Sequence, residues 1–456
     1  MELSSELFRE YDIRGVVDQD LTEDAVRQIG QAYGSMVKRA GGTTVTCGRD
    51  GRLHSERLQN SLMDGISMAG IDVVNIGLCP TPVLYFSIFS LKSDGGIQVT
   101  GSHNPPEFNG LKMCVGKGTI FGQAIRDLHE MILSGDLEAG AGTVKEYEII
   151  PEYLAYLHEN IRIARPLKVV LDCGNGVSAL VAPEAFRNSG CQVESLYCEV
   201  DGSFPNHHPD PTVVENLKDM QAKVQEIGAD FGIAFDGDGD RIGLVDEQGE
   251  VIYGDKILLF LSRDLLKNHP GATVIGEVKC SHVMYDDIRQ HGGNPVMWKT
   301  GHSLIKQKMK ETGALLAGEM SGHIFFADRF FGFDDATYAA LRVAEILSQD
   351  EKPLSSCFKD LPATFSTPEI RVDCPESEKF KVVQKAKDWF SSHYDTIDVD
   401  GVRILFPDGW GLIRASNTQP VLVLRFEAET PERLAEIREL VEKRLQEIRD
   451  EIQNQG

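Results

Sequence analysis

The chain has 456 residues and a mass of 50.4 kDa, more than one hydrophobic core usually supports, so we expect roughly three or four domains. Hydrophobic residues make up 41% and charged residues 25%, which is typical of a soluble globular protein. The 70 Asp and Glu outnumber the 46 Lys and Arg, and the formal charge of −24 argues against binding to nucleic acid or to an anionic membrane. An anionic substrate would need positive charge that is concentrated in one cleft.

The N-terminal residues and the cysteines indicate the compartment. Residues 1–10 are charged from the second position and lack the apolar stretch of a signal peptide, and no run approaches the roughly 18 apolar residues of a membrane span. The 9 cysteines are scattered without any Cys-x-x-Cys pair, which favours reduced thiols over disulfides or zinc ligands. We therefore expect a cytoplasmic protein.

Short apolar runs, each followed by a polar turn that is often rich in glycine, recur along the chain without a transparent sequence repeat. The runs are residues 96–100, 168–172, 231–235, 273–276 and 315–317. Their alternation with helical stretches predicts layered α/β units, in which ligands bind at the loops that follow the strands. Polar connections near 134–143, 246–250 and 348–368 divide the chain, and we expect domains at 1–147, 148–250, 251–364 and 365–456.

The first polar turn contains a serine next to a histidine. Thr100-Gly-Ser102-His103-Asn-Pro-Pro106 follows a predicted strand and places a hydroxyl beside an imidazole on a loop that two prolines stiffen. Taken alone, an ordinary Ser/Asn turn explains the segment better than a catalytic site. It is not the nucleophile elbow of α/β-hydrolases, because Gly-x-Ser-x-Gly is absent.

A glycine-rich turn in the second predicted domain suggests a different class of enzyme. Gly174-Asn-Gly176-Val-Ser-Ala179 fits the dinucleotide-binding fingerprint, and Glu194 stands where an acid that binds ribose would be expected. The turn alone therefore favours an NAD-dependent oxidoreductase. This hypothesis explains none of the other motifs, and such turns are common in α/β units.

An acidic loop after the strand at 231–235 is the strongest functional signal. Asp236-Gly-Asp238-Gly-Asp240-Arg241 has three carboxylates at alternating positions, separated by glycines that permit a tight backbone. Carboxylates that converge on one point repel each other without a cation, and so few protein oxygens favour Mg²⁺. The alternative is an EF-hand calcium loop that ends at Glu247, but Arg241 stands where that loop needs glycine and both flanks resemble strands.

Two polar segments and a helix follow in the second half of the chain. Gly318-Glu-Met-Ser-Gly-His323 follows the strand at 315–317, and read alone it is a turn. Arg414-Ala-Ser-Asn-Thr418 lies between two strand-like runs, and its guanidinium, hydroxyls and amide suit a phosphate that is held without being transferred. From Thr430 as N-cap and Pro431 as first helical residue, apolar residues every three or four positions predict a helix to 452.

These segments closely resemble the α-D-phosphohexomutase superfamily, in particular its bacterial phosphomannomutase/phosphoglucomutase branch. The resemblance rests on Ser102 in Thr-Gly-Ser-His-Asn-Pro, on the loop at 236–241, and on the segments 318–323 and 414–418. It also takes in Glu10-Tyr-Asp-Ile-Arg-Gly15 and Trp298-Lys-Thr-Gly-His-Ser303, so it extends over nearly the whole chain.

The resemblance implies an α/β protein with three related mixed α/β domains and a smaller C-terminal α+β domain, arranged in a heart shape around a central cleft. It implies that Ser102 carries a phosphoryl group and that Mg²⁺ binds between this phosphoserine and Asp236, Asp238 and Asp240. A phosphoserine carries a charge of about −1.5 to −2, which suits a divalent cation.

The same resemblance implies the remaining site residues. His103, Lys112 and Arg241 are expected as catalytic residues around the phosphoryl group on Ser102. Glu319 and Ser321 are expected on the 3- and 4-hydroxyls of the sugar. The other expected substrate-binding residues are Tyr11, Arg14, Lys279, His302, His323, Arg414, Ser416, Asn417 and Thr418. A general base among these groups is left open, because its pKa depends on burial.

We therefore predict an isomerase that interconverts mannose 6-phosphate with mannose 1-phosphate, and likewise the two glucose phosphates, through a phosphoserine and a 1,6-bisphosphate intermediate. Mg²⁺ and glucose or mannose 1,6-bisphosphate are the expected cofactors, a small phosphosugar is the expected partner, and we expect a monomer. At a net charge of −24, the hypothesis also requires that the basic site residues lie together.

Three alternatives stay open. One is a phosphoglucosamine mutase, whose branch typically has Gln in place of Met320 and Ala in place of Gly101. The second is the oxidoreductase described above, and the third is a calcium-binding module without catalytic activity.

Overall fold

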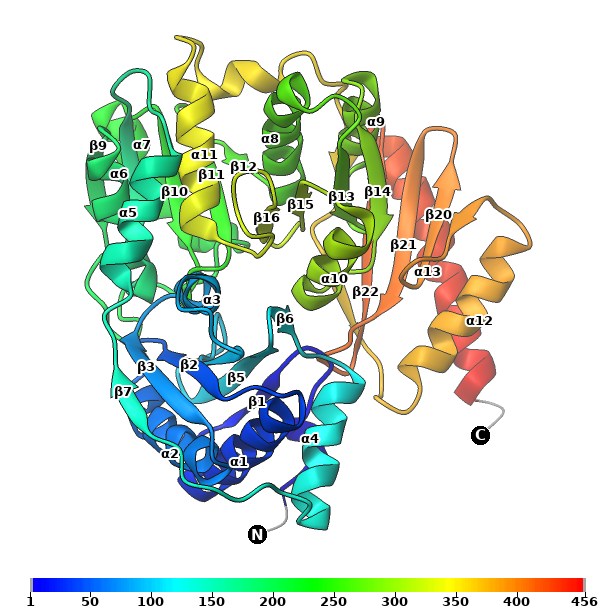
Figure 1. Cartoon of the computed structure of the whole chain (residues 1–456). Coiled ribbons are helices and arrows are strands. Elements are labelled where there is room, and N and C mark those ends of the chain that lie inside the picture. Colours follow the sequence, from blue (N-terminus) through cyan, green and yellow to red (C-terminus); the bar gives the residue numbers. More distant parts are fainter. Residues whose placement is uncertain (1–2, 454–456) are drawn as a thin grey trace.

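Four β-sheets follow one another along the chain, and each forms the centre of one structural unit (Figure 1). They are seen in a computed structural model, which describes residues 3–453. The first three sheets mix parallel and antiparallel strands, whereas the fourth is antiparallel throughout. Within the described range, no helix has both the length and the apolar character needed to cross a membrane.

The first unit has a seven-stranded sheet in the order β1-β5-β4-β2-β3-β7, with β6 beside β5. Every residue of β4 is buried, as is typical of a central strand that is covered on both faces. The elements of the unit are η1 (Ser5–Leu7), β1 (Ile13–Val16), α1 (Glu23–Arg39), β2 (Thr44–Arg49), α2 (Ser55–Met68), β3 (Asp72–Leu78), α3 (Thr81–Ser90), β4 (Gly95–Val99), β5 (Phe108–Val115), β6 (Gly118–Thr119), α4 (Gln123–Ser134) and β7 (Val144–Glu146).

The second unit has a five-stranded sheet in the order β12-β11-β10-β8-β9. Its elements are α5 (Ile150–Asn160), β8 (Lys168–Asp172), η2 (Val177–Leu180), α6 (Ala182–Asn188), β9 (Gln192–Leu196), η3 (Val214–Leu217), α7 (Lys218–Ile227), β10 (Phe231–Phe235), β11 (Ile242–Asp246) and β12 (Val251–Ile252). Because β12 pairs with β11, we propose that this unit extends to residue 252 and not only to the expected 250.

The third unit has a four-stranded sheet in the order β14-β13-β15-β16. Its elements are α8 (Gly254–Asn268), β13 (Thr273–Glu277), α9 (His282–Gln290), β14 (Asn294–Trp298), α10 (His302–Thr312), β15 (Leu316–Gly318), β16 (Ile324–Phe326), α11 (Ala336–Ser348) and η4 (Leu354–Phe358). The five apolar runs of the sequence thus form β4, β8, β10, β13 and β15, as predicted.

The fourth unit places an antiparallel sheet against two helices. The elements are β17 (Phe365–Ser366), β18 (Ile370–Asp373), α12 (Lys379–Ser391), β19 (Thr396–Ile397), β20 (Val402–Phe406), β21 (Gly409–Ala415), β22 (Val421–Ala428) and α13 (Pro431–Gln453). The predicted C-terminal helix is confirmed as α13, and the Thr430 hydroxyl accepts a hydrogen bond from the Arg433 N–H at 3.1 Å. The apolar stripe of α13 is buried against the sheet.

The first three units share one topological feature that the sequence did not reveal as a repeat. In each, a parallel strand turns back into an antiparallel neighbour: β4 into β5, β10 into β11, and β15 into β16. The three turns are the segments at 100–107, 236–241 and 319–323, which carry the serine, the acidic loop and the Glu-Met-Ser-Gly-His motif. The expected fold class, with three mixed α/β units and a smaller α+β unit, is confirmed.

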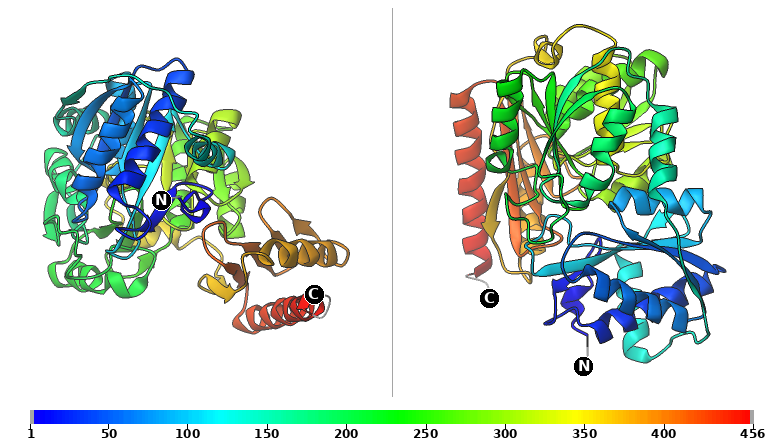
Figure 2. Two further views of the ribbon diagram at one scale, coloured as in Figure 1. Left: turned by 90° about the horizontal axis from the view of Figure 1, so that it is seen from below. Right: turned by 90° about the vertical axis from the view of Figure 1, so that its left-hand side faces the viewer.

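The hydrophobic cores show how the units are joined. One continuous core runs through the second and third units and takes in α3 of the first, whereas the first and fourth units each have a core of their own. A small apolar contact of Val278 with Trp410 and Leu412 links the third unit to the fourth. Figure 2 shows the fourth unit as a separate body at one side of the molecule.

Candidate active site

Ser102 lies at the junction of the first two units. Its side chain is buried, and its backbone has φ 49°, in the left-handed region that a non-glycine residue seldom adopts. The Ser102 Oγ donates to Asp236 Oδ2 at 2.9 Å and lies 3.1 Å from His103 Nδ1. The predicted serine and the acidic loop, which are far apart in sequence, are therefore in direct contact.

A buried arginine that the sequence did not single out holds the serine loop in place. Arg52 donates through its guanidinium to the carbonyls of Ser102 and Asn104 at 2.8 and 2.6 Å, and also to those of Pro105 and Phe108. The Asp50 carboxylate accepts from the Arg52 Nε at 3.2 Å. Because strained backbone persists only where its surroundings fix it, this network explains how Ser102 keeps its conformation.

The acidic loop has the geometry of a metal site. Asp236 Oδ1 accepts from the N–H groups of Gly239, Asp240 and Arg241 at 3.0 to 3.1 Å, which closes the loop on itself. Oxygens of Asp236, Asp238 and Asp240 lie within 4.8 Å of one another, and all three side chains are buried. The Oδ1 atoms of Asp238 and Asp240 are buried without a hydrogen-bond partner. These orphaned oxygens fit a hard divalent cation.

Electrostatics support the same interpretation. Burial raises the pKa of Asp236 well above its ordinary value, and the charges of Asp238 and Asp240 raise it further. Lys112 offsets part of this repulsion, since its ammonium contacts Asp238 Oδ2 at 2.7 Å and also contacts Asp240. Burial disfavours the ammonium, but the three aspartates outweigh that effect and raise the pKa of Lys112. A cation would relieve the remaining repulsion.

The calcium-loop alternative does not fit the structure. Glu247, which would be its last ligand, lies at the hairpin between β11 and β12 and accepts from the Ser355 hydroxyl at 2.5 Å. Both flanks of the acidic loop are strands and not helices, as the sequence indicated.

Several basic groups gather around the serine. Burial lowers the pKa of His103 well below its ordinary value, and the charges of Arg241 and Arg14 lower it further, so the imidazole is neutral. Arg14 donates to Asn104 Oδ1 at 2.6 Å and to Asp12 at 2.7 Å. Positive charge is therefore concentrated here despite the acidic composition of the chain.

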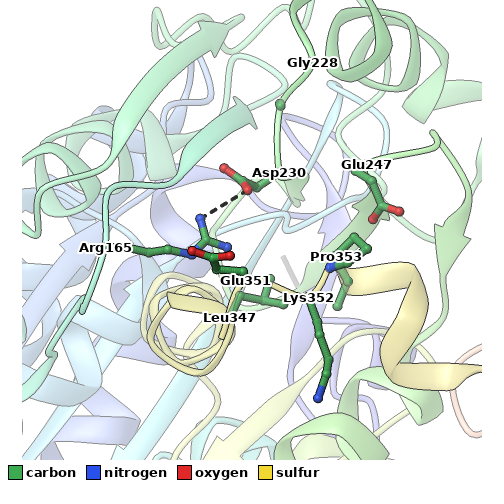
Figure 3. Close-up of a pocket in the computed structure, with 10 residues that line it drawn as sticks. Arg165, Gly228, Asp230, Glu247, Leu347, Glu351, Lys352 and Pro353 are labelled. Carbon is green, nitrogen blue, oxygen red and sulfur yellow. Dashed lines mark ion pairs between the residues drawn. The ribbon is translucent and has the colours of Figure 1, made fainter. Parts of the chain in front are cut away.

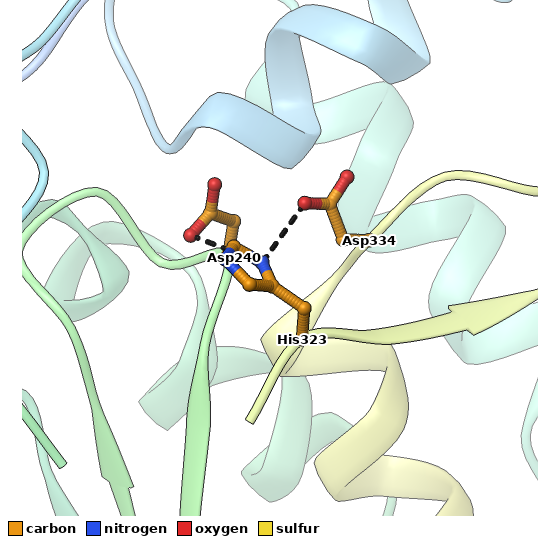
Figure 4. Close-up of side chains that lie close together, drawn as sticks. All are labelled: Asp240, His323 and Asp334. Atoms are coloured by element: carbon orange, nitrogen blue, oxygen red, sulfur yellow. Dashed lines mark ion pairs between the residues drawn. The ribbon is translucent and has the colours of Figure 1, made fainter. Parts of the chain in front are cut away.

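Arg241 connects the acidic loop to the turn of the third unit through His323. Its Nε donates to His323 Nε2 at 2.9 Å, so the other ring nitrogen, Nδ1, carries the proton. That nitrogen lies 3.0 Å from Asp334 Oδ2 and 3.6 Å from Asp240 Oδ1 (Figure 4). Asp334 also forms an ion pair with Lys306, with 3.0 Å between Oδ1 and Nζ. Arg241 and Lys306 already contact this cluster, so an imidazole whose Nδ1–H faces the two carboxylates fits it better than a second metal.

The turn of the third unit presents a buried carboxylate. Glu319 is buried, and its Oε1 accepts from the Gly301 N–H at 2.6 Å. Burial raises the pKa of Glu319 above its ordinary value. Ser321, in the same turn, is half-buried. The rings of His302 and His323 stack, with their centroids 5.6 Å apart.

The turn at 414–418 places the fourth unit against the other units. Arg414 is buried and donates to Asp400 Oδ2 at 2.9 Å. Asn417 donates through Nδ2 to the Tyr11 hydroxyl at 2.6 Å, and that hydroxyl donates to the Thr300 carbonyl at 2.9 Å. Tyr11 of the first unit thus contacts both the third and the fourth unit.

Two more predicted residues of this region make local contacts. The Ser416 hydroxyl accepts from the N–H groups of Thr418 and Gln419 at 3.3 and 3.1 Å. Lys279 of the third unit pairs with Glu369 of the fourth at 3.0 Å. Burial disfavours the Lys279 ammonium, but the charges of Glu277 and Glu369 outweigh burial and the opposing charge of Arg414, and they raise the pKa of Lys279.

Sequence reasoning missed four buried residues of this region: Asp50, Arg52, Thr81 and Asp334. Thr81 donates to Asp238 Oδ2 at 2.6 Å. The adjacent acids at 334 and 335, after the aromatic run Phe330-Phe-Gly-Phe333, were the one visible signal. The others carry no local pattern.

The glycine-rich turn at 174–179 does not form a dinucleotide site. A Cβ on Gly176 would lie 2.9 Å from the Gly237 carbonyl, and the Val177 N–H donates to that carbonyl at 3.2 Å. The turn is followed by the short 3₁₀ helix η2 and not directly by an α-helix. It therefore supports the acidic loop from behind.

A pocket of about 130 Å³ lies between the second and third units and holds none of the predicted site residues (Figure 3). Arg165 and Asp230 pair across it at 3.5 Å. Lys352 and Pro353, between α11 and η4, also line it, and it has no bearing on the site.

The chain belongs to the phosphoglucomutase/phosphomannomutase family. Profiles for its alpha/beta/alpha domains I, II and III match residues 5–136, 151–249 and 253–365, and the profile for its C-terminal domain matches residues 369–444. The resemblance to the phosphohexomutase superfamily that the motifs indicated is thereby confirmed.

Particular relatives are similar over nearly their whole length. A phosphomannomutase/phosphoglucomutase of Pseudomonas aeruginosa is 49% identical over 449 residues, 98% of this chain and 96% of that protein. A crystal structure of a phosphoglucomutase/phosphomannomutase family protein from Burkholderia thailandensis has a TM-score of 0.92 at 42% identity, with 98% of each chain covered. A probable phosphoglucosamine mutase of Methanopyrus kandleri is 35% identical, with 96% of this chain and 98% of that protein covered.

Proposed function

We propose that the chain is a phosphomannomutase/phosphoglucomutase, an isomerase that moves a phosphoryl group between the 1- and 6-positions of mannose and glucose phosphates. The observation that carries this proposal is the 2.9 Å contact of the Ser102 hydroxyl with Asp236. This contact joins the serine and the acidic loop in a single reacting centre. The Arg414–Thr418 turn would form a separate binding site for the second phosphate, which does not react.

In this proposal Ser102 carries the phosphoryl group. Mg²⁺ would be held by Asp236, Asp238 and Asp240 with an oxygen of the phosphoserine, and it would supply neutralisation of charge on the transferred group. Lys112 contacts the same carboxylates, and Arg241 lies at the end of the loop, so both stabilise charge on the phosphoryl oxygens. Burial lowers the pKa of His103 and of His302, so both imidazoles are neutral and add no positive charge to the site.

The sugar would bind between Glu319 with Ser321 on one side and the fourth unit on the other. A carboxylate accepts hydrogen bonds from two neighbouring hydroxyls, which suits the 3- and 4-hydroxyls. Glucose and mannose differ only at carbon 2, so this contact serves both sugars. Arg414, Ser416, Asn417 and Thr418 would hold the phosphate that does not react, with Tyr11, Arg14, Lys279 and His323 lining the same region.

Transfer from Ser102 would give glucose or mannose 1,6-bisphosphate, and return of the other phosphate to Ser102 would release the product. The bisphosphate must reverse its orientation between the two transfers. Because all the residues named come from one chain, a monomer suffices.

Phosphoglucosamine mutase is the second candidate, and the packing of Gly101 argues against it. A Cβ at this position would lie 2.4 Å from the Nε of Arg52, which is buried and fully hydrogen-bonded. The Ala that is typical of the glucosamine branch would therefore displace the arginine that holds the serine loop.

The test is a coupled mutase assay with mannose 1-phosphate, glucose 1-phosphate and glucosamine 1-phosphate, using the wild type and Ser102→Ala. We expect turnover of the first two sugars, and a loss of at least about a thousandfold in Ser102→Ala with an unchanged circular dichroism spectrum. Full activity of that variant, or turnover of the glucosamine phosphate alone, would refute the proposal.

A further inference from the structure

Two cysteines outside the site lie in contact at the ends of neighbouring strands. Cys173 follows β8 and Cys198 lies two residues beyond β9, and these strands are parallel and adjacent. The two sulfur atoms are 3.1 Å apart. All nine cysteines of the chain are free thiols, so the pair is reduced.

The contact depends on an unusual backbone conformation. Side chains of a strand alternate between its faces, so a regular continuation of β9 would direct Tyr197 and Cys198 to opposite faces. Tyr197 has φ 52°, in the left-handed region that a bulky residue rarely adopts. Its carbonyl accepts from the Asn175 N–H at 2.8 Å and its hydroxyl donates to Asp219 at 2.6 Å, which hold this turn. The turn brings the Cys198 sulfur back over Cys173.

The two thiols differ in exposure and in acidity. Cys173 is fully buried, whereas Cys198 is half-buried and accessible to a small solute. The hydrogen bond between the two thiols lowers the pKa of Cys198, while burial raises the pKa of Cys173. Cys198 is thus the thiol that an oxidant reaches first, and Cys173 is in place to react second.

We propose that Cys173 and Cys198 form a reversible disulfide when the protein meets a peroxide, and that this bond alters the acidic loop. The Cys198 thiolate attacks the peroxide, the O–O bond breaks, and a sulfenic acid and hydroxide form. The Cys173 thiol then attacks the Cys198 sulfur, the S–S bond forms, and the oxygen leaves as water with the thiol proton. Two thiols and one hydrogen peroxide give one disulfide and two waters.

The pair is coupled to the site through short contacts. Cys173 begins the turn in which Gly176 packs on Gly237 and the Val177 N–H donates to the Gly237 carbonyl at 3.2 Å. The residue before it, Asp172, contacts His207 at 3.0 Å, and the next residue along, His208, contacts the carbonyl of His103. Drawing the two sulfurs to bonding distance shifts this turn, and hence the loops on both sides of Ser102.

The covalent change is tested on the full-length protein. Reduced wild type is treated with hydrogen peroxide, unfolded, and alkylated with N-ethylmaleimide for intact and peptide mass measurement. We expect two fewer alkylated thiols than in the untreated control, a cross-linked peptide pair that contains both cysteines, and recovery with dithiothreitol. Nine alkylated thiols, or a disulfide between other cysteines, would overturn the proposal.

Single substitutions locate the effect. Cys198→Ser should retain all its remaining thiols after peroxide, because the thiol that reacts first is absent. Cys173→Ser should form no cross-linked peptide pair and should lose only the Cys198 thiol, as an unresolved sulfenic acid. Cys357→Ser should still form the disulfide. Cys357 is the matched control because it is also half-buried and its thiol contacts the Pro353 carbonyl at 3.9 Å. A loss of two alkylated thiols in peroxide-treated Cys198→Ser would refute the pairing of Cys173 with Cys198.

The effect on the acidic loop has a separate readout that rests on the proposed Mg²⁺ site but does not depend on turnover of a sugar phosphate. Mg²⁺ affinity of reduced and oxidised wild type, measured by calorimetry, should differ by at least about threefold, with no difference for peroxide-treated Cys198→Ser. The mutase activity, which does rest on the proposed function, should fall in parallel. Equal Mg²⁺ affinity in the two forms would overturn the coupling even if the disulfide forms.

Discussion

Asp334 is a buried carboxylate whose role the sequence analysis did not identify. Its carboxylate is fully buried, faces the protonated nitrogen of His323 at 3.0 Å and pairs with Lys306 at 3.0 Å. His323 in turn accepts from Arg241 at 2.9 Å. Asp334 does not contact the serine or the acidic loop's metal oxygens by itself, so we regard it as a residue that positions the His323–Arg241 pair.

Replacing Asp334 by Asn should lower kcat by about tenfold to a hundredfold with little change in KM, because an orienting carboxylate is lost while the sugar contacts remain. Steady-state kinetics measure this split. The control is Asp335→Asn, which alters the N-cap of α11, where the carboxylate accepts from the Tyr338 N–H at 2.8 Å. It should lower Tm and leave kcat unchanged. An Asp334→Asn enzyme with wild-type kcat would contradict the positioning role.

His302 makes the stability of the protein depend on pH. Burial, followed by the charge of Lys306, lowers the pKa of His302 well below its ordinary value of 6.5. In the unfolded chain the imidazole takes up a proton below that value, while the folded state refuses it. Stability therefore rises with pH where the unfolded state binds more protons, and it is lost as the pH falls below 6.5.

We expect the apparent Tm of the wild type to fall between about pH 7 and pH 5, and to fall less steeply in His302→Gln, which has no proton to take up. Differential scanning calorimetry across this range gives both slopes. A steeper fall of Tm with decreasing pH in His302→Gln would show that His302 does not destabilise the folded protein at low pH.

At the scale of elements, the turns between a parallel strand and its antiparallel neighbour place the site. The turn after β10 and the turn after β4 touch without space for a side chain, since a Cβ on Gly237 would lie 2.5 Å from the carbonyl oxygen of Ser102. Both partners at this contact, Gly237 and the Ser102 carbonyl, are backbone groups, so neither can move aside without shifting its loop.

Gly237→Ala should therefore push the acidic loop away from Ser102 and weaken Mg²⁺ binding by about tenfold or more, as calorimetry would measure. Gly118→Ala is the control, because a Cβ there meets only the Val115 carbonyl at 3.9 Å. Its Mg²⁺ affinity and activity should equal those of the wild type. Unchanged affinity in Gly237→Ala would mean that the two loops are not constrained by each other.

The strands, the last helix and the polar turns could be predicted because each is encoded locally. Apolar runs that end in Gly-rich turns gave β4, β10 and β15, and Thr430-Pro431 gave the start of α13. Arg52 could not be predicted, since its carbonyl partners near Ser102 lie 50 residues away and carry no side-chain signal. The role of Asp334 could not be predicted either, because it exists only once the third unit has packed against the second.

At the scale of the whole molecule, the fourth unit is joined to the rest less firmly than the other units are to each other. Its core is separate, and polar groups carry much of its attachment to the third unit. Arg403 donates to the carbonyls of Val278 and Cys280 at 2.7 and 2.8 Å, and Arg425 donates to that of Lys279 at 2.7 Å. Toward the first unit it has the Tyr11–Asn417 contact and a bond from Arg9 to the Thr418 carbonyl at 2.8 Å.

Such an attachment suits a unit that opens and closes while a bound sugar turns. Hydrogen-bonded hinges with little shared apolar surface permit rotation at modest cost, whereas the continuous core of the second and third units resists it. If the proposed bisphosphate intermediate forms, we therefore expect the fourth unit to move against a rigid remainder while the intermediate reverses its orientation.

The most direct test is to follow a labelled phosphoryl group. The enzyme is charged on Ser102 with radioactive phosphate, freed of excess label, and mixed with unlabelled glucose 1-phosphate in a single turnover. We predict that the label leaves the protein at the rate of turnover and is recovered in glucose 1,6-bisphosphate and glucose 6-phosphate. Label that stays on the protein while product forms would contradict the phosphoserine mechanism.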